Sequence, residues 1–408
     1  MNRLLLLSIG VFFAAVTYAQ KIPLINSGEV IEQAKLLYDS GKYDAAISKF
    51  LTVPKRDTNY VYMLTELALS YIAHEQYDKA ITTCDEALKN RSTHRGHLLR
   101  SKCIALDKKG SYDESVALFK KSIDEYPVDI RLIYNLGITY YNHQEHDKAI
   151  DCFFRVLAIN PFHAGSHLNL GRISVGHGRK THAMMSIGMY LGISNEDNER
   201  LVYIDKVLSN QIEDEGTLKA TDVNSCEKLD QIIRAKLALD KNFKSNLPVD
   251  APVVKQYEMF FQQLNLLPAS SQDRWLEYYL PIYKAIKDQG LTETYLYHIL
   301  SSANNDQVRK WKQKNEKSLN TFFQLANTEL SRHREVITVP ASLGFDSPVQ
   351  AWYDDSNRIE AVGKKDSNGK RLGYWLYFNN SLEHSAEGKY NDAGEKAGVW
   401  KFYYPDGT

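Results

Sequence analysis

The residues with the clearest chemical potential in this 408-residue chain are His143 and His146, which flank Gln144 and Glu145. Imidazoles and a carboxylate at short spacing can bind zinc, but this segment matches neither H-E-x-x-H nor H-x-x-E-H. The surrounding sequence instead indicates a turn between two helices. We therefore interpret the segment as turn surface and expect no metal site there.

Other catalytic signatures do not occur in the sequence. There is no G-x-S-x-G, no G-x-x-x-x-G-K-[ST], no C-x-x-C and no dinucleotide fingerprint. The glycines from Gly165 to Gly178 follow no expected strand, so they are not a phosphate loop. We expect no enzyme activity, no catalytic residue and no cofactor. A hydrolase site hidden in the middle of the chain is the alternative, because sequence alone cannot show two carboxylates facing across a cleft.

Three of the four cysteines, Cys84, Cys103 and Cys152, fall near core positions of expected helices. Cys84 and Cys103 lie on consecutive helices and could form a disulfide. We favour buried free thiols, because cysteine packs well as a small apolar residue.

The elements that position all these residues follow a repeat. The repeat is marked by Asp44, Asp78, Asp113, Asp147 and Thr181, each with a small residue two positions later. Their spacings of 34, 35, 34 and 34 residues predict a solenoid of helical hairpins. We interpret the five oxygen-bearing side chains as helix caps. Solenoids form extended concave surfaces that typically bind other polypeptides.

The clearest unit runs from about Arg131 to Pro161. Its repeat positions are Ile133, Leu136, Gly137, Tyr140, Ala149, Phe153 and Pro161. Apart from Ile in place of Trp, this pattern resembles the tetratricopeptide repeat. Gly137 and Ala149 leave room for two helices to approach closely. Five such units cover residues 27–193, and the fifth is rich in Gly and Met, as expected where a terminal repeat meets another element.

The resemblance implies a right-handed superhelix whose first helices line a concave groove for a protein or peptide partner. Ten residues of this chain occupy the positions of the repeat that face the groove: Tyr62, Thr65, Leu69, His97, Arg100, Arg131, Tyr134, Ile138, Tyr141 and Arg172. Tyrosine and arginine suit peptide recognition, although a merely solvated helix face is the alternative for each position. Some tetratricopeptide proteins use Lys and Asn side chains to clamp the terminal carboxylate of a peptide. In this chain only Asn135 and Asn169 lie near the positions of that clamp, so the clamp is not reproduced.

The N-terminus has the pattern of a secretory signal. Arg3 is followed by the apolar run Leu4 to Val16, and Thr17-Tyr18-Ala19 predicts cleavage after Ala19. We expect a mature protein outside the cytoplasm, in a periplasm, cell envelope or secreted fraction, with no membrane span after signal removal. The balance of 50 Lys and Arg against 50 Asp and Glu argues against nucleic acid as a partner.

Residues 194–340 lose the repeat register but keep helical periodicity, which predicts a second helical domain. A first helix is expected at Asn195 to Asn210, followed by a polar break at Glu213 to Gly216. Further helices are expected around Leu229 to Leu237, Trp275 to Ile286, Tyr295 to Trp311 and Leu319 to Phe323. The aromatic stretch from Trp275 to Pro281 could be a binding box, but we interpret it as core.

The last segment, residues 345–408, contains a different repeat. Gly363, Gly369, Gly373 and Trp375 recur 25 residues later as Gly388, Gly394, Gly398 and Trp400. Alternating aromatic residues predict strands, with hairpin turns at Asn368-Gly369 and Asp406-Gly407. The pattern resembles the bacterial variant of the MORN β-hairpin repeat. The last strand is expected either to be an open edge or to pair with a strand supplied by a further repeat or by a partner, and self-association through the sheet is an alternative.

The sequence thus predicts a mainly α fold: an α-solenoid of about five hairpins, a helical block and a small antiparallel β-hairpin sheet. The arrangement resembles that of exported tetratricopeptide proteins of Bacteroidota. We expect a non-enzymatic scaffold that binds a protein through its groove, with the sheet as a second contact. The alternatives are a glycan-acting envelope hydrolase, with its site between helical block and sheet, and a self-associating structural component.

Overall fold

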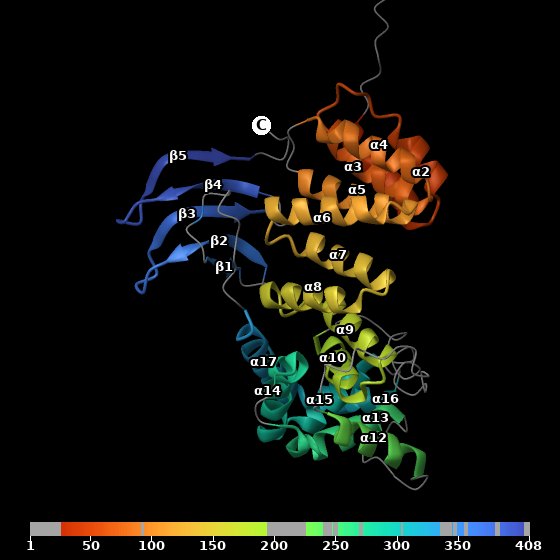
Figure 1. Ribbon diagram of the computed structural model, residues 1–408, viewed down its shortest axis with the longest axis vertical. Coiled ribbons are helices and arrows are strands. Elements are labelled where there is room, and N and C mark those ends of the chain that lie inside the picture. Colours follow the sequence, from red (N-terminus) through yellow and green to blue (C-terminus); the bar gives the residue numbers. More distant parts are fainter. Residues whose placement is uncertain are drawn as a thin grey trace, which may run out of the picture.

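The computed structural model describes residues 26–90, 94–193, 226–239, 247, 252–268, 272–302, 305–334, 345, 349–354, 358–379 and 384–403 (Figure 1). Four expectations lie outside these residues. They are the signal of residues 1–19, the helix from Asn195 to Asn210, the polar break that follows it and the turn at Asp406-Gly407.

The first half of the described chain is a solenoid of five helical hairpins, as the sequence predicted. The first helices are α1 (Ser27–Asp39), α3 (Tyr60–Ala73), α5 (Arg95–Lys109), α7 (Ile130–Asn142) and α9 (Ala164–Gly176). The second helices are α2 (Tyr43–Phe50), α4 (Tyr77–Leu88), α6 (Tyr112–Glu125), α8 (His146–Ile159) and α10 (Lys180–Ile193). Figure 1 shows the hairpins following one another along the long axis of the molecule.

Small residues allow the two helices of a hairpin to touch, which confirms the packing role expected for Gly137. A Cβ at Gly137 would lie 2.9 Å from the Cβ of Cys152 and 2.9 Å from the ring of Phe153. At the equivalent Gly171, a Cβ would lie 2.4 Å from Ile187. Larger side chains at these positions would push the helices apart.

The repeated acidic residues are not helix caps, so that interpretation is wrong. Helices α2, α4, α6 and α8 begin without a side-chain cap, and the aspartates lie in their first turns. There they suit the positive end of the helix dipole. They also join neighbouring repeats: Asp44 contacts His74 at 3.0 Å, and Asp78 contacts Lys109 at 2.5 Å. At Asp44 and Asp78 the repeated position therefore makes contacts between hairpins.

The helical block packs against the end of the solenoid. It comprises α12 (Glu227–Leu239), α13 (Pro252–Gln262), α14 (Arg274–Asp288), α15 (Thr292–Ile299), α16 (Asp306–Lys314) and α17 (Glu316–Ser331), with short 3-10 turns at Leu264–Leu266 and Leu300–Ser302. The helices expected around Leu229, Trp275 and Leu319 are confirmed. The stretch from Tyr295 to Trp311 forms two helices, and α13 was not foreseen.

The block buries α10 along most of its length, which explains the Gly and Met content of the fifth hairpin. The tyrosine hydroxyls of Tyr257 and Tyr283 donate to the carbonyls of Met184 and Met185, at 2.7 and 2.8 Å. The aromatic stretch of α14 is core, as expected, since Trp275 is 8% exposed.

The C-terminal segment forms a five-stranded antiparallel meander in the order β1-β2-β3-β4-β5. Its strands are β1 (Gln350–Tyr353), β2 (Ile359–Lys365), β3 (Arg371–Phe378), β4 (His384–Tyr390) and β5 (Lys396–Phe402). The 25-residue repeat reflects one packing rule: Trp375 covers Gly363, and Trp400 covers Gly388. A Cβ at either glycine would lie 2.3 Å from the indole ring.

The sheet packs against the solenoid beside α6, α7 and α8 (Figure 1). Tyr353 of β1 donates a hydrogen bond to the carbonyl of Ile159 at the end of α8. Tyr126, after α6, packs against His384 of β4 with ring centroids 4.9 Å apart. The outer edge of β5 pairs with no other described strand, and Val399 on it is 84% exposed.

Cys84, Cys103 and Cys152 are buried thiols that form no disulfide, as predicted, and Cys226 is also buried outside any disulfide. Burial raises the pKa of Cys84 to about 12, so this thiol stays protonated at neutral pH.

Candidate protein-binding face of the first helices

Nine of the ten residues predicted to bind a partner are at least partly exposed on the first helices of the solenoid. We call these nine the first-helix face: Tyr62, Leu69, His97, Arg100, Arg131, Tyr134, Ile138, Tyr141 and Arg172. Thr65 is the exception, and its prediction is wrong. It is fully buried where α3 contacts α1 and α5, and its hydroxyl donates to the carbonyl of Val61 at 2.9 Å.

At the N-terminal end of the face, Tyr62 is held by two basic residues. The hydroxyl of Tyr62 accepts a hydrogen bond from Lys35 of α1 at 3.3 Å. Its ring packs against His94, which precedes α5, at a centroid distance of 5.4 Å. The hydrogen bond to Glu32, and then that to Tyr62, raises the pKa of Lys35, which therefore stays charged.

Cationic groups gather at the centre of the face. The pKa of His97 is lowered to about 3, first by burial and then by the charges of Arg100, Arg131 and His94. His97 is therefore neutral at pH 7. Arg131 binds Asp129 through both its Nε and Nη2 atoms, at 3.0 and 3.1 Å. This bidentate pair fixes the orientation of one guanidinium on the face.

At the C-terminal end, the tyrosines are positioned by α9. The hydroxyl of Tyr134 accepts a hydrogen bond from Asn169 at 2.9 Å, and its ring packs edge-on against His163. The guanidinium of Arg172 lies 5.7 Å from the ring centroid of Tyr141. Because Arg172 is exposed and supported by an aromatic ring, it presents donors to solvent in a defined place.

The two histidines of the 143–146 segment contact different groups, which confirms the turn interpretation. His143 contacts Asp107 of α5 at 2.9 Å. His146, the first residue of α8, contacts His177 at 2.7 Å. The two side chains thus serve separate contacts between neighbouring hairpins.

The nine residues of the first-helix face include three arginines and three tyrosines, and one of the arginines, Arg131, already pairs with the carboxylate of Asp129. Such a face can donate paired hydrogen bonds to carboxylates and offer rigid aromatic area to apolar side chains. Sequence reasoning missed the supporting residues that begin the first helices. Asn59, His94, Asp129 and His163 are the N-cap residues of α3, α5, α7 and α9. Their repeat spacing is the signal that could have revealed them.

Family comparisons identify the repeats. A model described as tetratricopeptide repeat matches residues 130–163, and a second with the same description matches residues 31–95 and 65–130. These stretches of the chain are therefore tetratricopeptide repeats. Repeats of this kind bind protein partners, which supports a role for the chain as a protein–protein interaction scaffold.

Two curated proteins resemble the repeat region. BBSome complex member BBS4 of Bos taurus is 26% identical over 36% of this chain and 28% of its own length. Tetratricopeptide repeat-containing protein trd-1 of Caenorhabditis elegans is 24% identical over 43% of this chain and 21% of its own length. The chain thus matches less than a third of either relative.

Solved structures also resemble the solenoid. A thermophilic tetratricopeptide protein from Thermus thermophilus is 19% identical, covering 45% of this chain and all of that chain at a TM-score of 0.39. MamA from Desulfovibrio magneticus is 18% identical, covering 41% of this chain and 94% of that chain at a TM-score of 0.33. No helix in the described ranges is long and apolar enough to cross a membrane.

Proposed function

We propose that this protein is an exported, non-enzymatic scaffold whose first-helix face lines a groove for a protein segment rich in carboxylates. The observation that carries the proposal is the exposed guanidinium of Arg172, which the ring of Tyr141 supports at a distance of 5.7 Å on a face that also presents two further tyrosines. Opposite charge on the partner would steer association and fix its register. A relative named as a member of a protein complex is in keeping with such a role.

The sheet provides a second contact in this proposal. Val399 and Phe402 of β5 are 84% and 53% exposed, beside backbone groups that pair with no described strand on that side. Exposed apolar residues on an unpaired strand favour pairing with another strand. A partner engaged by both the groove and this edge would bind more tightly than through either alone.

The export proposal predicts a shortened chain. After expression with its own N-terminus in a secreting bacterial host, the protein outside the cytoplasm should begin at Gln20. Intact-mass analysis would measure this directly. An unprocessed chain confined to the cytoplasm would contradict export while leaving the groove proposal in place.

The double variant Arg172→Glu with Tyr141→Ala should weaken binding of an acidic segment by at least about tenfold. The substitutions reverse one exposed charge and remove the ring that supports it. The probe is a short fluorescein-labelled peptide that alternates Glu and Leu, measured by fluorescence anisotropy at low salt. A peptide alternating Lys and Leu tests the charge preference.

Lys120→Glu is the matched control, because Lys120 is exposed on a second helix, α6, outside the first-helix face. It changes the net charge of the chain as Arg172→Glu does. Equal loss of binding in both variants, or equal binding of the acidic and basic peptides, would overturn the proposed recognition. Circular dichroism should show unchanged helix content in each variant.

A further inference from the structure

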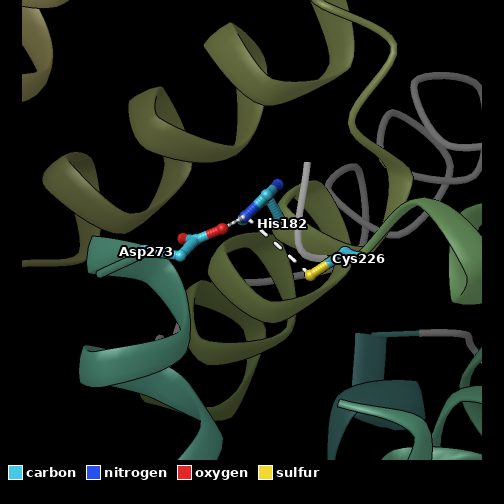
Figure 2. Close-up of side chains that lie close together, drawn as sticks. All are labelled: His182, Cys226 and Asp273. Atoms are coloured by element: carbon cyan, nitrogen blue, oxygen red, sulfur yellow. Dashed lines mark hydrogen bonds and ion pairs between the residues drawn. The ribbon is translucent and has the colours of Figure 1, made fainter. Parts of the chain in front are cut away.

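Three side chains that could bind a metal ion lie together where the solenoid meets the helical block. They are His182 of α10, Cys226 just before α12 and Asp273 just before α14 (Figure 2). His182 is fully buried, Cys226 is 1% exposed, and the side chain of Asp273 is 8% exposed. The donor atoms lie within 4.8 Å of one another.

Both neighbours of the imidazole face the same nitrogen. Nε2 of His182 lies 2.7 Å from Oδ2 of Asp273 and 3.9 Å from Sγ of Cys226. In a catalytic group of cysteine, histidine and aspartate, one ring nitrogen of the histidine accepts the thiol proton while the other donates a hydrogen bond to the carboxylate, which orients the ring. The thiol and the carboxylate must therefore face opposite ring nitrogens. This geometry therefore does not make a catalytic triad, and the group is closed to substrate.

We propose that His182, Cys226 and Asp273 form a structural site for a divalent metal ion of the zinc class. Nitrogen, thiolate and carboxylate donors are the ligands of zinc, with Zn–N of about 2.0–2.1 Å and Zn–S of about 2.3 Å. Tetrahedral bonds of these lengths require about 3.6 Å between N and S and about 3.4 Å between N and O. The observed separations of 3.9 and 2.7 Å reach these values with side-chain shifts of less than about 1 Å.

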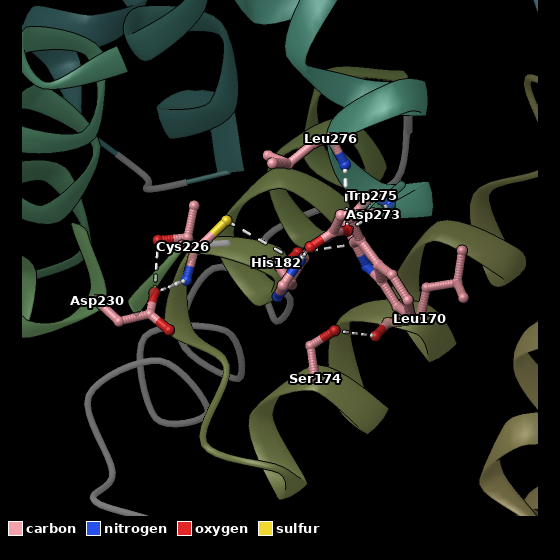
Figure 3. Close-up of polar contacts among 10 residues, drawn as sticks. Leu170, Ser174, His182, Cys226, Asp230, Asp273, Trp275 and Leu276 are labelled. Carbon is pink, nitrogen blue, oxygen red and sulfur yellow. Dashed lines mark hydrogen bonds and ion pairs between the residues drawn. The ribbon is translucent and has the colours of Figure 1, made fainter. Parts of the chain in front are cut away.

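The surrounding residues hold the carboxylate and the ring in place (Figure 3). Oδ1 of Asp273 accepts hydrogen bonds from the backbone N–H groups of Trp275 and Leu276, which leaves Oδ2 directed at His182. The indole of Trp275 packs against the imidazole at 5.2 Å and donates to Ser186 at 2.9 Å. The ligands are thus arranged before any ion arrives.

Charge balance favours the buried site. A divalent ion with one thiolate and one carboxylate is neutral overall, so that its burial avoids an uncompensated charge. Binding forms the metal–sulfur bond and releases the thiol proton to solvent. A water molecule completes four-fold coordination. The ion would join three elements that are separated in sequence by 44 and 47 residues, and would tie the block to the solenoid.

One feature limits the affinity. Nδ1 of His182 is buried and has no hydrogen-bond partner among the residues described here. With the metal on Nε2, Nδ1 carries the ring proton, and the lack of an acceptor typically lowers metal affinity about 10- to 100-fold. Because of this lower affinity, the ion is expected to be removable and replaceable in the folded protein.

The test is titration of the purified full-length protein with Co²⁺, which takes tetrahedral zinc sites and reports thiolate ligands by an ultraviolet charge-transfer band. We expect about one Co²⁺ per chain, displacement of Co²⁺ by Zn²⁺ and a higher melting temperature with metal. Cys226→Ser should abolish the band. Asp273→Asn should weaken binding at least about tenfold while keeping the N-cap of α14, since asparagine caps helices as well as aspartate.

Cys84→Ser is the matched control, because Cys84 is a buried free thiol with no place in the group. It should keep the band unchanged. No thiolate band at equimolar Co²⁺ in the unsubstituted protein would overturn the proposal, as would a band of equal intensity in Cys226→Ser. If Cys226→Ser fails to fold, unchanged affinity in Asp273→Asn would be the contradicting result.

Discussion

At about pH 5 the protein is expected to be less stable than at about pH 7.5 by at least about 4 kcal/mol, because His167 and His298, which are buried and neutral in the native state, alone contribute about that much. His97 and His163, whose pKa values burial lowers to about 3 and about 4, add to this loss. His167 of α9 and His298 of α15 are 0% and 9% exposed. Burial lowers their pKa values from 6.5 to about 3 and about 4. Both histidines lie in the packed region that joins solenoid and block.

The hydrogen bonds of both rings fit the neutral form. Nε2 of His167 lies 2.9 Å from the carbonyl of Pro161, which can only accept, so Nδ1 accepts from the hydroxyl of Tyr279 at 2.7 Å. Nε2 of His298 likewise donates to the carbonyl of Gly192, at 2.9 Å. Nδ1 of His298 has no partner in the described part of the chain. A second ring proton on His298 would therefore be buried without an acceptor, whereas on His167 it would force the Tyr279 hydroxyl to change from donor to acceptor.

The direction of the pH effect follows from proton counts. Below about pH 6.5 the unfolded chain binds a proton at each histidine, whereas the native chain does not until pH falls near the lowered pKa. Acid therefore favours unfolding, by about 1.4 kcal/mol per pH unit for each ring. Between about pH 6.5 and 5 this gives about 2 kcal/mol per histidine.

Urea unfolding followed by tryptophan fluorescence measures the effect, since all five tryptophans lie in the block or the sheet. His298→Gln removes one titrating group and keeps a donor near Gly192. It should reduce the pH dependence by about 2 kcal/mol. Identical pH dependence in this variant and the unsubstituted protein would mean that His298 does not contribute to the loss of stability at low pH.

Gly188→Ala is expected to destabilise the block by about 3–5 kcal/mol. A Cβ at Gly188 would lie 2.3, 2.5 and 2.7 Å from the hydroxyls of Tyr295, Tyr283 and Tyr257. All three rings are fully buried, and two of the hydroxyls donate to carbonyls of α10. One added methyl group must displace rigid rings and break buried hydrogen bonds, and both changes are costly.

Gly176→Ala is the matched control at the end of α9. A Cβ there meets nothing within 4 Å, and the backbone is not left-handed. Its stability should stay equal or rise by up to about 1 kcal/mol, as for alanine at a helical position. Urea titration of both variants at neutral pH makes the comparison. Equal stability in the two would mean that the tyrosine hydroxyls do not crowd Gly188.

The sequence allowed prediction of the solenoid because its packing contacts recur at a fixed interval. Gly137 and Gly171 occupy the same repeat position and make the same close approach. In the sheet, Gly363 and Gly388 each lie beneath a tryptophan, so that spacing also has a direct packing cause. The caps were assigned wrongly because a repeated aspartate fits both a cap and the first turn of a helix, and spacing alone does not distinguish them.

The candidate sites were predictable only in part. Helical periodicity placed Tyr134, Ile138 and Tyr141 together, and all three are partly exposed. It failed for Thr65, because α3 also packs against two neighbouring first helices. The group of His182, Cys226 and Asp273 has no sequence motif, since its members meet only when the block folds onto α10. The spacing of neighbouring residues cannot predict contacts between side chains that lie this far apart in the sequence.

The most direct test of the central proposal is site-specific crosslinking. A photoreactive phenylalanine analogue replaces Tyr141 in one variant and Lys120 in another, and each is irradiated with an extract of the native source. The proposal predicts that position 141 crosslinks a protein through a segment rich in Asp and Glu, whereas position 120 does not. Crosslinking of the same protein with equal yield at both positions, or of none at position 141, would contradict it.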